Sequence, residues 1–181
     1  IHPDWTFMRV SPGVSFATIA DQMLYTPLQT GIASGVLNGW MRHTFRSYHT
    51  ATGLLSEIFM EYWDYDDWRD CYQIGALRTA RVNPTVMTIA PNLSIGIPCP
   101  LAGYTITGDY HSAPVSFAAD ADKPSLPVEF RMMIVGYAMM AYAQFESASE
   151  VYAQGKQYYD PLLSRLEGSR LREIRAVGAL A

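Results

Sequence analysis

Acidic residues stand close enough together at two places in the chain to bind a metal ion or to perform acid–base chemistry. The first place is GDYHSAPVSFAADADKPSLPVEF (108–130), where Asp120 and Asp122 form an Asp-x-Asp pair. Two carboxylates at this spacing offer hard oxygen ligands to Ca²⁺. An EF-hand loop starting at Asp120 would also need glycine at its sixth position and glutamate at its twelfth. Ser125 and Arg131 occupy those positions, so the calcium-loop pattern fails.

The same stretch carries the signals of a helix start. Ser125 is placed to cap a following helix, Pro127 suits the first turn, and Glu129 favours the positive end of the helix dipole. These signals predict a joint that orders a helix start and binds no ion, with a metal site as the less favoured alternative. The structural joint consists of Asp120, Asp122, Ser125 and Pro127.

The second acidic cluster lies within residues 61–70 and holds five of the 17 acidic residues of the chain. Paired carboxylates can perform acid–base catalysis or hold Mg²⁺. Here they alternate with aromatic residues, a pattern typical of a helix with an aromatic face packed on a sheet and an acidic face in solvent. We therefore predict an acidic structural or interface face, and keep a metal-dependent enzyme as the less favoured alternative. The face consists of Glu61, Asp64, Asp66, Asp67 and Asp70.

The remaining reactive residue types form no catalytic pattern. His43 and His49 are six residues apart, which matches neither HExxH nor a common zinc spacing. Cys71 has only Arg69 nearby to activate its thiol. The sequence contains no GxSxG, GxGxxG or GxxxxGK[ST] motif. We therefore expect no enzyme activity and no cofactor.

The composition predicts an ordered chain that associates with copies of itself. Of the 181 residues, 49% are hydrophobic and only 17% are charged. So few charges leave a monomer short of polar surface, whereas a subunit can cover apolar flanks with its neighbours. The net charge of −4 provides no overall attraction to nucleic acid. No apolar run approaches the ~20 residues of a membrane span, so we expect no membrane contact.

The first two thirds of the chain predict strands and turns. VSFATI (14–19) and MLYTPL (23–28) resemble the two arms of a hairpin. Three further runs, separated by turn residues, predict an antiparallel meander over 85–91, 93–98 and 103–110. HTFRSYHT (43–50) is a further candidate strand, and a short helix is expected near 66–74, capped by Asp66 and ended by Gly75.

After residue 124 the apolar residues follow a helical period. Two helices are predicted, over about 127–146 and 149–167, with Pro161 expected to kink the second. The apolar face predicted for the first helix consists of Phe130, Ile134, Tyr137, Ala138, Ala141 and Phe145. The face of the second consists of Val151, Gly155, Tyr158, Leu162 and Leu166.

The predicted fold is α+β, in a single domain over residues 1–181. An antiparallel β-rich body (1–124) is followed by a C-terminal helical hairpin (125–167) and an extended tail (168–181).

Residues 83–167 resemble the head–tail adaptor (connector) proteins of tailed bacteriophages. The shared pattern is a "P-x-P…Y-x-I-x-G-x-Y" strand, a "P…D-x-D-x-P-x-L-P-x-x-F" loop and an "I-V-x-Y-A-M-x-x-Y-A" helix. SFATIADQMLYTP (15–27) and YDDWRDCYQIG (65–75) also resemble the family. The matching residues are Pro98, Pro100, Tyr104, Gly108, Tyr110, Pro114, Asp120, Asp122, Pro124, Leu126, Pro127, Phe130, Ile134, Val135, Tyr137, Ala138, Met139, Tyr142 and Ala143.

The resemblance implies a structural virion protein of the phage neck, assembled in the host cytoplasm. It implies a homo-oligomeric ring, by analogy a dodecamer, that docks beneath the portal protein after DNA packaging. The ring would present a surface to a stopper or tail-completion protein, and genomic DNA would pass through its lumen without sequence-specific binding. An acidic face suits such a lumen because it repels phosphate. A stopper or tail-completion neck protein is the alternative.

The segment GSRLREIRAVGALA (168–181) is the candidate portal-binding arm. Gly168-Ser169 is expected to stop the preceding helix. The segment carries a net charge of +2, whereas residues 1–167 carry −6. A basic, partly apolar segment can become ordered on an acidic partner, although a frayed terminus is the alternative. The residues expected to bind the portal are Arg170, Leu171, Arg172, Ile174 and Arg175.

Overall fold

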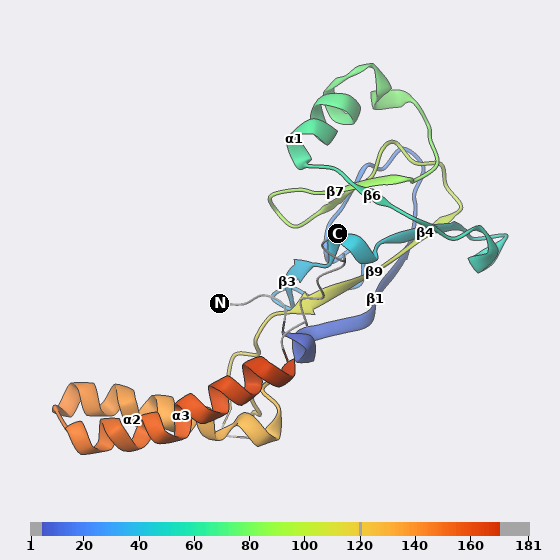
Figure 1. The fold of residues 1–181 in the computed structure, drawn as a ribbon. Coiled ribbons are helices and arrows are strands. Elements are labelled where there is room, and N and C mark those ends of the chain that lie inside the picture. The colour runs from blue at the N-terminus through green and yellow to red at the C-terminus, as the bar shows by residue number, and fades with distance from the viewer. Residues whose placement is uncertain (1–4, 120, 171–181) are drawn as a thin grey trace, which may run out of the picture. The chain divides into compact units, whose positions relative to one another are not determined.

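The computed structural model describes residues 5–119 and 121–170, without the side chains of Ala76 and Arg170. Its contacts divide the chain into two compact units. The β unit spans Arg9–Ala113 and contains all the described strands. The helical unit combines the described residues from Pro114 to Arg170 with residues 5–8, and holds the long helices (Figure 1). The predicted α+β class is confirmed, while folding as one domain stays a prediction.

The larger sheet of the β unit is built on two long strands that come from opposite ends of the unit. Strand β1 (Arg9–Ala17) pairs antiparallel with β9 (Tyr104–Ser112) along almost its whole length, with Phe16 opposite Ile106. The other edge of β9 pairs with β3 (Leu37–Trp40) and β4 (Arg46–His49), and β5 (Ile58–Phe59) extends the sheet beside β4. Strand β4 confirms the strand predicted within 43–50.

The smaller sheet has the order β2-β8-β7-β6. Its strands are β2 (Leu24–Tyr25), β8 (Ile95–Gly96), β7 (Val86–Ile89) and β6 (Glu61–Tyr62), with β6 parallel to β7. Strands β7 and β8 pair antiparallel, as two arms of the predicted meander should. The third arm is β9, which belongs to the larger sheet. The hairpin predicted from 14–19 and 23–28 is wrong, because β1 pairs with β9 and β2 pairs with β8.

Both sheets share one hydrophobic core. Its fully buried side chains include Phe45, Met87, Ile95 and Ile106. Gly108 in β9 makes room for Phe45, since a Cβ at this position would stand 2.7 Å from the Phe45 ring. Burial of such side chains contributes about 1.5–3 kcal/mol each, so this packing, rather than the short ladders of the smaller sheet, holds the two sheets together.

Short helical turns connect the strands and lead into the long helices. They are η1 (Thr6–Met8), η2 (Arg42–Thr44), η3 (Gly53–Ser56), α1 (Tyr65–Trp68), η4 (Arg69–Ile74), η5 (Ala76–Thr79) and η6 (Val128–Phe130). The predicted short helix near 66–74 corresponds to α1 and η4, and Gly75 ends it. Asp66 is not its cap, because the helix begins at Tyr65 and Asp64 occupies the N-cap position.

The helical unit is a hairpin of α2 (Met132–Glu146) and α3 (Ser149–Arg170). Ser147 turns the chain between them in the left-handed conformation, at φ 55°. The helices meet at two glycines. A Cβ on Gly136 would stand 2.8 Å from the carbonyl oxygen of Gly155, and a Cβ on Gly155 would stand 2.7 Å from that of Gly136. Only glycine permits backbones to approach this closely.

The open end of the hairpin has its own small core. Phe130, Met133 and Leu166 are buried there. The partly buried side chains around them are Trp5, Phe7, Leu126, Tyr159, Leu162 and Leu163.

The face that α2 turns towards α3 differs from the prediction. Phe130 just before the helix is buried as expected, but the buried residues of α2 itself are Met133, Gly136 and Ala143. Phe145, on the face predicted to be buried, is 84% exposed. Apolar residues surround α2 on every side, so their period does not single out one face. The close approach at the two glycines selects the buried face.

Both expected boundaries of the hairpin are also shifted. Pro127, rather than Ser125, occupies the N-cap position of η6, whose first residue is Val128. Helix α3 continues through Gly168 and Ser169 to Arg170. A single glycine lowers helix stability by only about 1 kcal/mol relative to alanine, so it need not end the helix.

Filling the glycine contact should destabilise the hairpin. We expect Gly136→Ala or Gly155→Ala to lower the free energy of unfolding by about 1–3 kcal/mol, because each new methyl meets a backbone carbonyl that cannot turn aside. Thermal denaturation followed by circular dichroism measures the change.

The matched control is Gly168→Ala, in the same hairpin. A Cβ there meets nothing within 4 Å, so alanine should leave stability unchanged or raise it by up to about 1 kcal/mol. Equal effects of the three substitutions would contradict the importance of the close approach.

Candidate functional site

The acidic face of the β unit is held by the smaller sheet. The Glu61 amide donates to the carbonyl oxygen of Thr85 at 2.8 Å, and the Trp63 amide donates to that of Met87 at 2.9 Å. Trp68 of α1 is fully buried beside Gly96 of β8, where a Cβ would stand 3.2 Å from the indole ring. These contacts place the aromatic residues against the sheet, as the sequence predicts. All five predicted carboxylates are exposed, on Glu61, Asp64, Asp66, Asp67 and Asp70.

One arginine offsets part of this acidic charge. Arg69 lies 3.1 Å from Asp66 and 3.0 Å from Asp70, and its hydrogen bond to Asp70 raises the pKa of the guanidinium. Asp64, Asp67 and Asp70 line a hollow of about 520 Å³, together with aromatic rings. Among the described residues, no three or more His, Cys, Asp or Glu side chains are arranged to hold a metal ion. The five exposed acids form a charged surface on the β unit.

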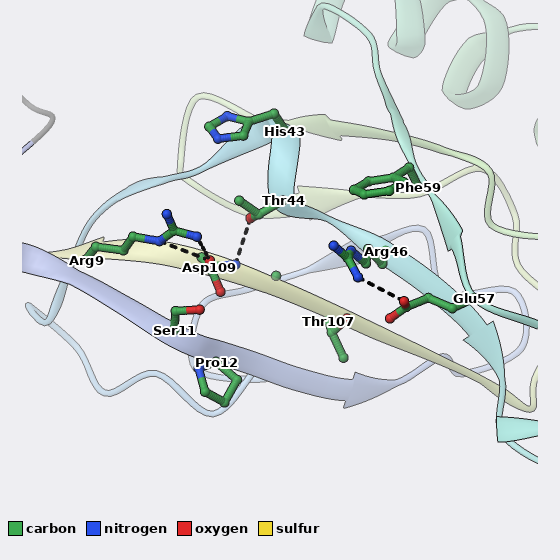
Figure 2. A pocket seen from close by; sticks show the side chains of 11 residues that line it. Arg9, Ser11, Pro12, His43, Thr44, Arg46, Glu57, Phe59, Thr107 and Asp109 are labelled. Carbon is green, nitrogen blue, oxygen red and sulfur yellow. Dashed lines mark hydrogen bonds and ion pairs between the residues drawn. The ribbon is translucent and has the colours of Figure 1, made fainter. Parts of the chain in front are cut away.

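A second, polar pocket lies on the larger sheet (Figure 2). It has a volume of about 540 Å³ and draws its walls from segments far apart in sequence. Figure 2 shows Arg9 and Asp109 facing each other across β1 and β9, and Arg46 and Glu57 paired farther along the sheet. The lining residues are Arg9, Ser11, Pro12, His43, Thr44, Arg46, Glu57, Phe59, Thr107, Gly108 and Asp109.

The Arg9–Asp109 pair is the less exposed of the two ion pairs in this pocket. Both Nε and Nη2 of Arg9 donate to Oδ2 of Asp109, with Nε at 3.2 Å, and the Asp109 side chain is only 12% exposed. The Asp109 backbone amide donates to Oγ1 of Thr44 at 2.9 Å. These contacts join β1, β9 and η2 into one wall of the pocket.

The Arg46–Glu57 pair forms the opposite wall. Nη1 of Arg46 lies 2.9 Å from Oε2 of Glu57, and the guanidinium also stacks 4.4 Å from the centre of the Phe59 ring. Each arginine in the pocket is already bound to a carboxylate, so the charges of the two ion pairs cancel. This arrangement can form hydrogen bonds with polar groups of a partner, but it offers no unpaired cation for an anion.

Sequence reasoning missed this pocket. Asp109 stands in the same acidic stretch as Asp122, yet the two belong to different units of the structure. The partner of Asp109 is 100 residues away in sequence, in β1. No local motif indicates such a pairing, and only the pairing of β1 with β9 reveals it.

The structural joint is described at three of its four residues. Oδ2 of Asp122 accepts hydrogen bonds from the amides of Ala118 and Ala119, at 2.7 and 2.9 Å. These bonds lower the pKa of the Asp122 carboxyl below its usual value of 3.8. Asp122 thus bridges back to Ala118 and Ala119 within the loop that precedes η6. Asp120 lies outside the described residues.

The predicted portal-binding arm lies almost wholly outside the described residues. Arg170 is the last residue of α3, and its side chain is not described. The other predicted arm residues, Leu171, Arg172, Ile174 and Arg175, lie outside the described part of the chain. Their role stays a prediction.

Comparison with known proteins identifies the class of protein to which this fold belongs. The family model of the SU10 adaptor protein matches residues 6–179, nearly the whole chain. No curated protein matches the sequence. The chain belongs to this family of phage head–tail adaptor proteins, which confirms the resemblance seen in the sequence. Within residues 5–119 and 121–170, no helix has the length and apolar character needed to cross a membrane.

The Arg9–Asp109 pair should matter more for stability than an exposed pair. We expect Arg9→Ala to lower the free energy of unfolding by about 1–3 kcal/mol, because it leaves a largely buried carboxylate without its main donor. Urea denaturation measures the change. The control is Arg81→Ala, which breaks the pair with Asp21, where both side chains are more than half exposed. A loss as large in the control would contradict the special role of the pocket pair.

The loop tied by Asp122 should loosen only in acid. Because its folded pKa is lowered, the carboxylate stabilises the loop above its usual pKa of 3.8, and this effect disappears as pH falls through the lowered value. In NMR titrations, the Ala118 and Ala119 amides should shift with a midpoint below 3.8.

The matched variant is Asp122→Asn, which keeps an acceptor oxygen but cannot ionise, and should abolish the transition. A midpoint at or above the usual value would contradict the role of Asp122 in the loop. Stoichiometric Ca²⁺ or Mg²⁺ binding that is lost in Asp120→Ala/Asp122→Ala would overturn the prediction of a joint without an ion.

Proposed function

We propose that this head–tail adaptor forms a ring of identical copies, twelve by the family resemblance, that docks beneath the portal after DNA packaging. The ring then carries the tail or the next neck protein. The observation that supports the structural role in the virion is the family match over residues 6–179. The same match favours an adaptor over a stopper or tail-completion protein.

Exposed apolar side chains support assembly with other subunits. The connection between β4 and β5 carries Leu54, which is 70% exposed, and Leu55, which is 99% exposed, with Phe59 66% exposed at its base. In Figure 1 this connection projects from the β unit. Scattered apolar residues are normal on a surface, but adjacent, almost uncovered leucines at a projecting tip are typical of a contact with a partner. The tip is a candidate site for a neighbouring neck protein or another copy.

The acidic face supports a role beside the DNA path. Its five carboxylates are exposed, and Arg69 is paired within the face. A negative surface has no attraction for phosphate, so DNA can slide past without being held. We propose that Glu61, Asp64, Asp66, Asp67 and Asp70 face the lumen or a neighbouring subunit.

The residues after α3 are the proposed contact with the portal. Since α3 extends to Arg170, the arm starts no earlier than residue 171. Its apolar residues Leu171 and Ile174 would anchor it, while Arg172 and Arg175 would pair with portal carboxylates.

Removing the arm tests this function. We expect a chain lacking residues 171–181 to stay folded, with the melting temperature of the whole chain, but no longer to join portal-bearing heads. Complementation of heads that lack the adaptor measures the joining of tails. The control is Arg172→Lys/Arg175→Lys in the full-length chain, which keeps the arm and its charge and should retain most activity. Normal tail joining by the truncated chain would overturn the role of the arm.

A further inference from the structure

Helix α2 has two apolar faces, and α3 covers only one of them. The covered face contains Met133, Gly136 and Ala143, all buried. Glu146, the last residue of α2, is the only charged side chain among its 15 residues. A helix that is apolar all round needs cover on every side.

The uncovered face follows the spacing of a helix-packing seam. Ile134, Ala138, Ala141 and Phe145 form what we call the outer stripe, with steps of four, three and four residues. This is the a/d spacing that brings one helix against another. All four residues are exposed, with Ile134 at 44% and Phe145 at 84%. The two alanines in the middle leave room for another helix to come close, as the glycines do on the opposite side.

The exposed area is large enough for a protein contact. Tyr137 and Tyr142 flank the outer stripe and are 63% and 59% exposed. With Phe145 they expose roughly 400 Å², taking about 200 Å² for one aromatic side chain. That is half of the ~800 Å² that each partner contributes to a standard interface, before the aliphatic residues are counted.

The chemistry of the outer stripe favours a copy of the same chain as its partner. The four residues carry no charge, so the stripe can meet a different surface of the next copy, as a ring requires, without like-charge repulsion. The outward face of α3 differs, because Gln157, Asp160 and Ser164 are exposed there. The hairpin therefore has one apolar and one polar side, as expected of a subunit that packs against a neighbour.

We propose that the outer stripe of α2 binds the helical unit of a second copy of this chain and forms a side-to-side contact of the ring. The inference rests on the proposed ring, because only a ring or other oligomer supplies a neighbouring copy. It names the surface through which neighbouring copies would meet, which the proposed ring does not specify.

Charge substitutions on the two sides of the hairpin test this contact. Ile134→Glu and Phe145→Glu each place a carboxylate in the outer stripe, whereas Gln157→Glu places one on the polar side. Copies per portal-bearing head, counted by electron microscopy and quantitative gels, measure assembly. We expect Gln157→Glu to assemble like the unchanged chain, and both stripe variants to bind their neighbours more than about tenfold more weakly.

Melting temperature and cross-linking identify what covers the stripe. The isolated stripe variants should melt like the unchanged chain, since a face open in the monomer loses nothing. A marked fall in melting would show that the chain covers the stripe itself and would overturn the proposal. Ala141→Cys in a Cys71→Ser background, labelled with a short maleimide–diazirine cross-linker and photoactivated on assembled heads, should give a product of two copies of this chain.

Two other results separate this inference from the proposed function. Normal rings formed by both stripe variants, or a cross-link from position 141 only to the portal, would overturn the role of the outer stripe while leaving the adaptor ring intact. Failure of the unchanged chain to assemble on heads would instead overturn the ring itself, and the inference with it.

Discussion

The backbone contact between Gly136 and Gly155 determines how the helical unit presents its surface. Because each glycine carbonyl occupies the space where the other residue would carry a Cβ, the helices can meet closely on this line. This close approach places Met133 and Ala143 in the interior of the hairpin and leaves Phe145 exposed. One steric constraint thus decides which apolar residues stabilise the hairpin and which remain available to a partner.

The β unit depends on contacts between residues that lie far apart in the sequence. Strand β9 pairs with β1 on one edge and with β3 and β4 on the other, so the larger sheet exists only when residues about 100 positions apart meet. The ion pair between Arg9 and Asp109 stabilises the pairing of β1 with β9 at one end of the ladder. The smaller sheet then holds α1, and through it the acidic face. Two surfaces of different character result, one polar with paired charges and one acidic and exposed.

Local features of this structure could be predicted from the sequence, and distant ones could not. The helical hairpin and the β7–β8 pairing follow from residue period and turn residues within a short span. The exposure of the five acids follows from the aromatic residues between them, which need a sheet to pack on. The partner of β1 cannot be predicted in this way, because several β-rich runs offer equally suitable edges. The sequence pattern also does not predict which face of α2 is buried, because apolar residues lie on all sides of this helix. The glycine contact that selects the face depends on both helices together.

We propose that this adaptor assembles as a ring of identical copies beneath the portal. Electron microscopy of packaged, portal-bearing heads, with and without the purified protein, can show whether this ring forms. We expect added density that forms a closed ring of copies at the portal vertex. No added density at this vertex, or a single copy per particle, would contradict it.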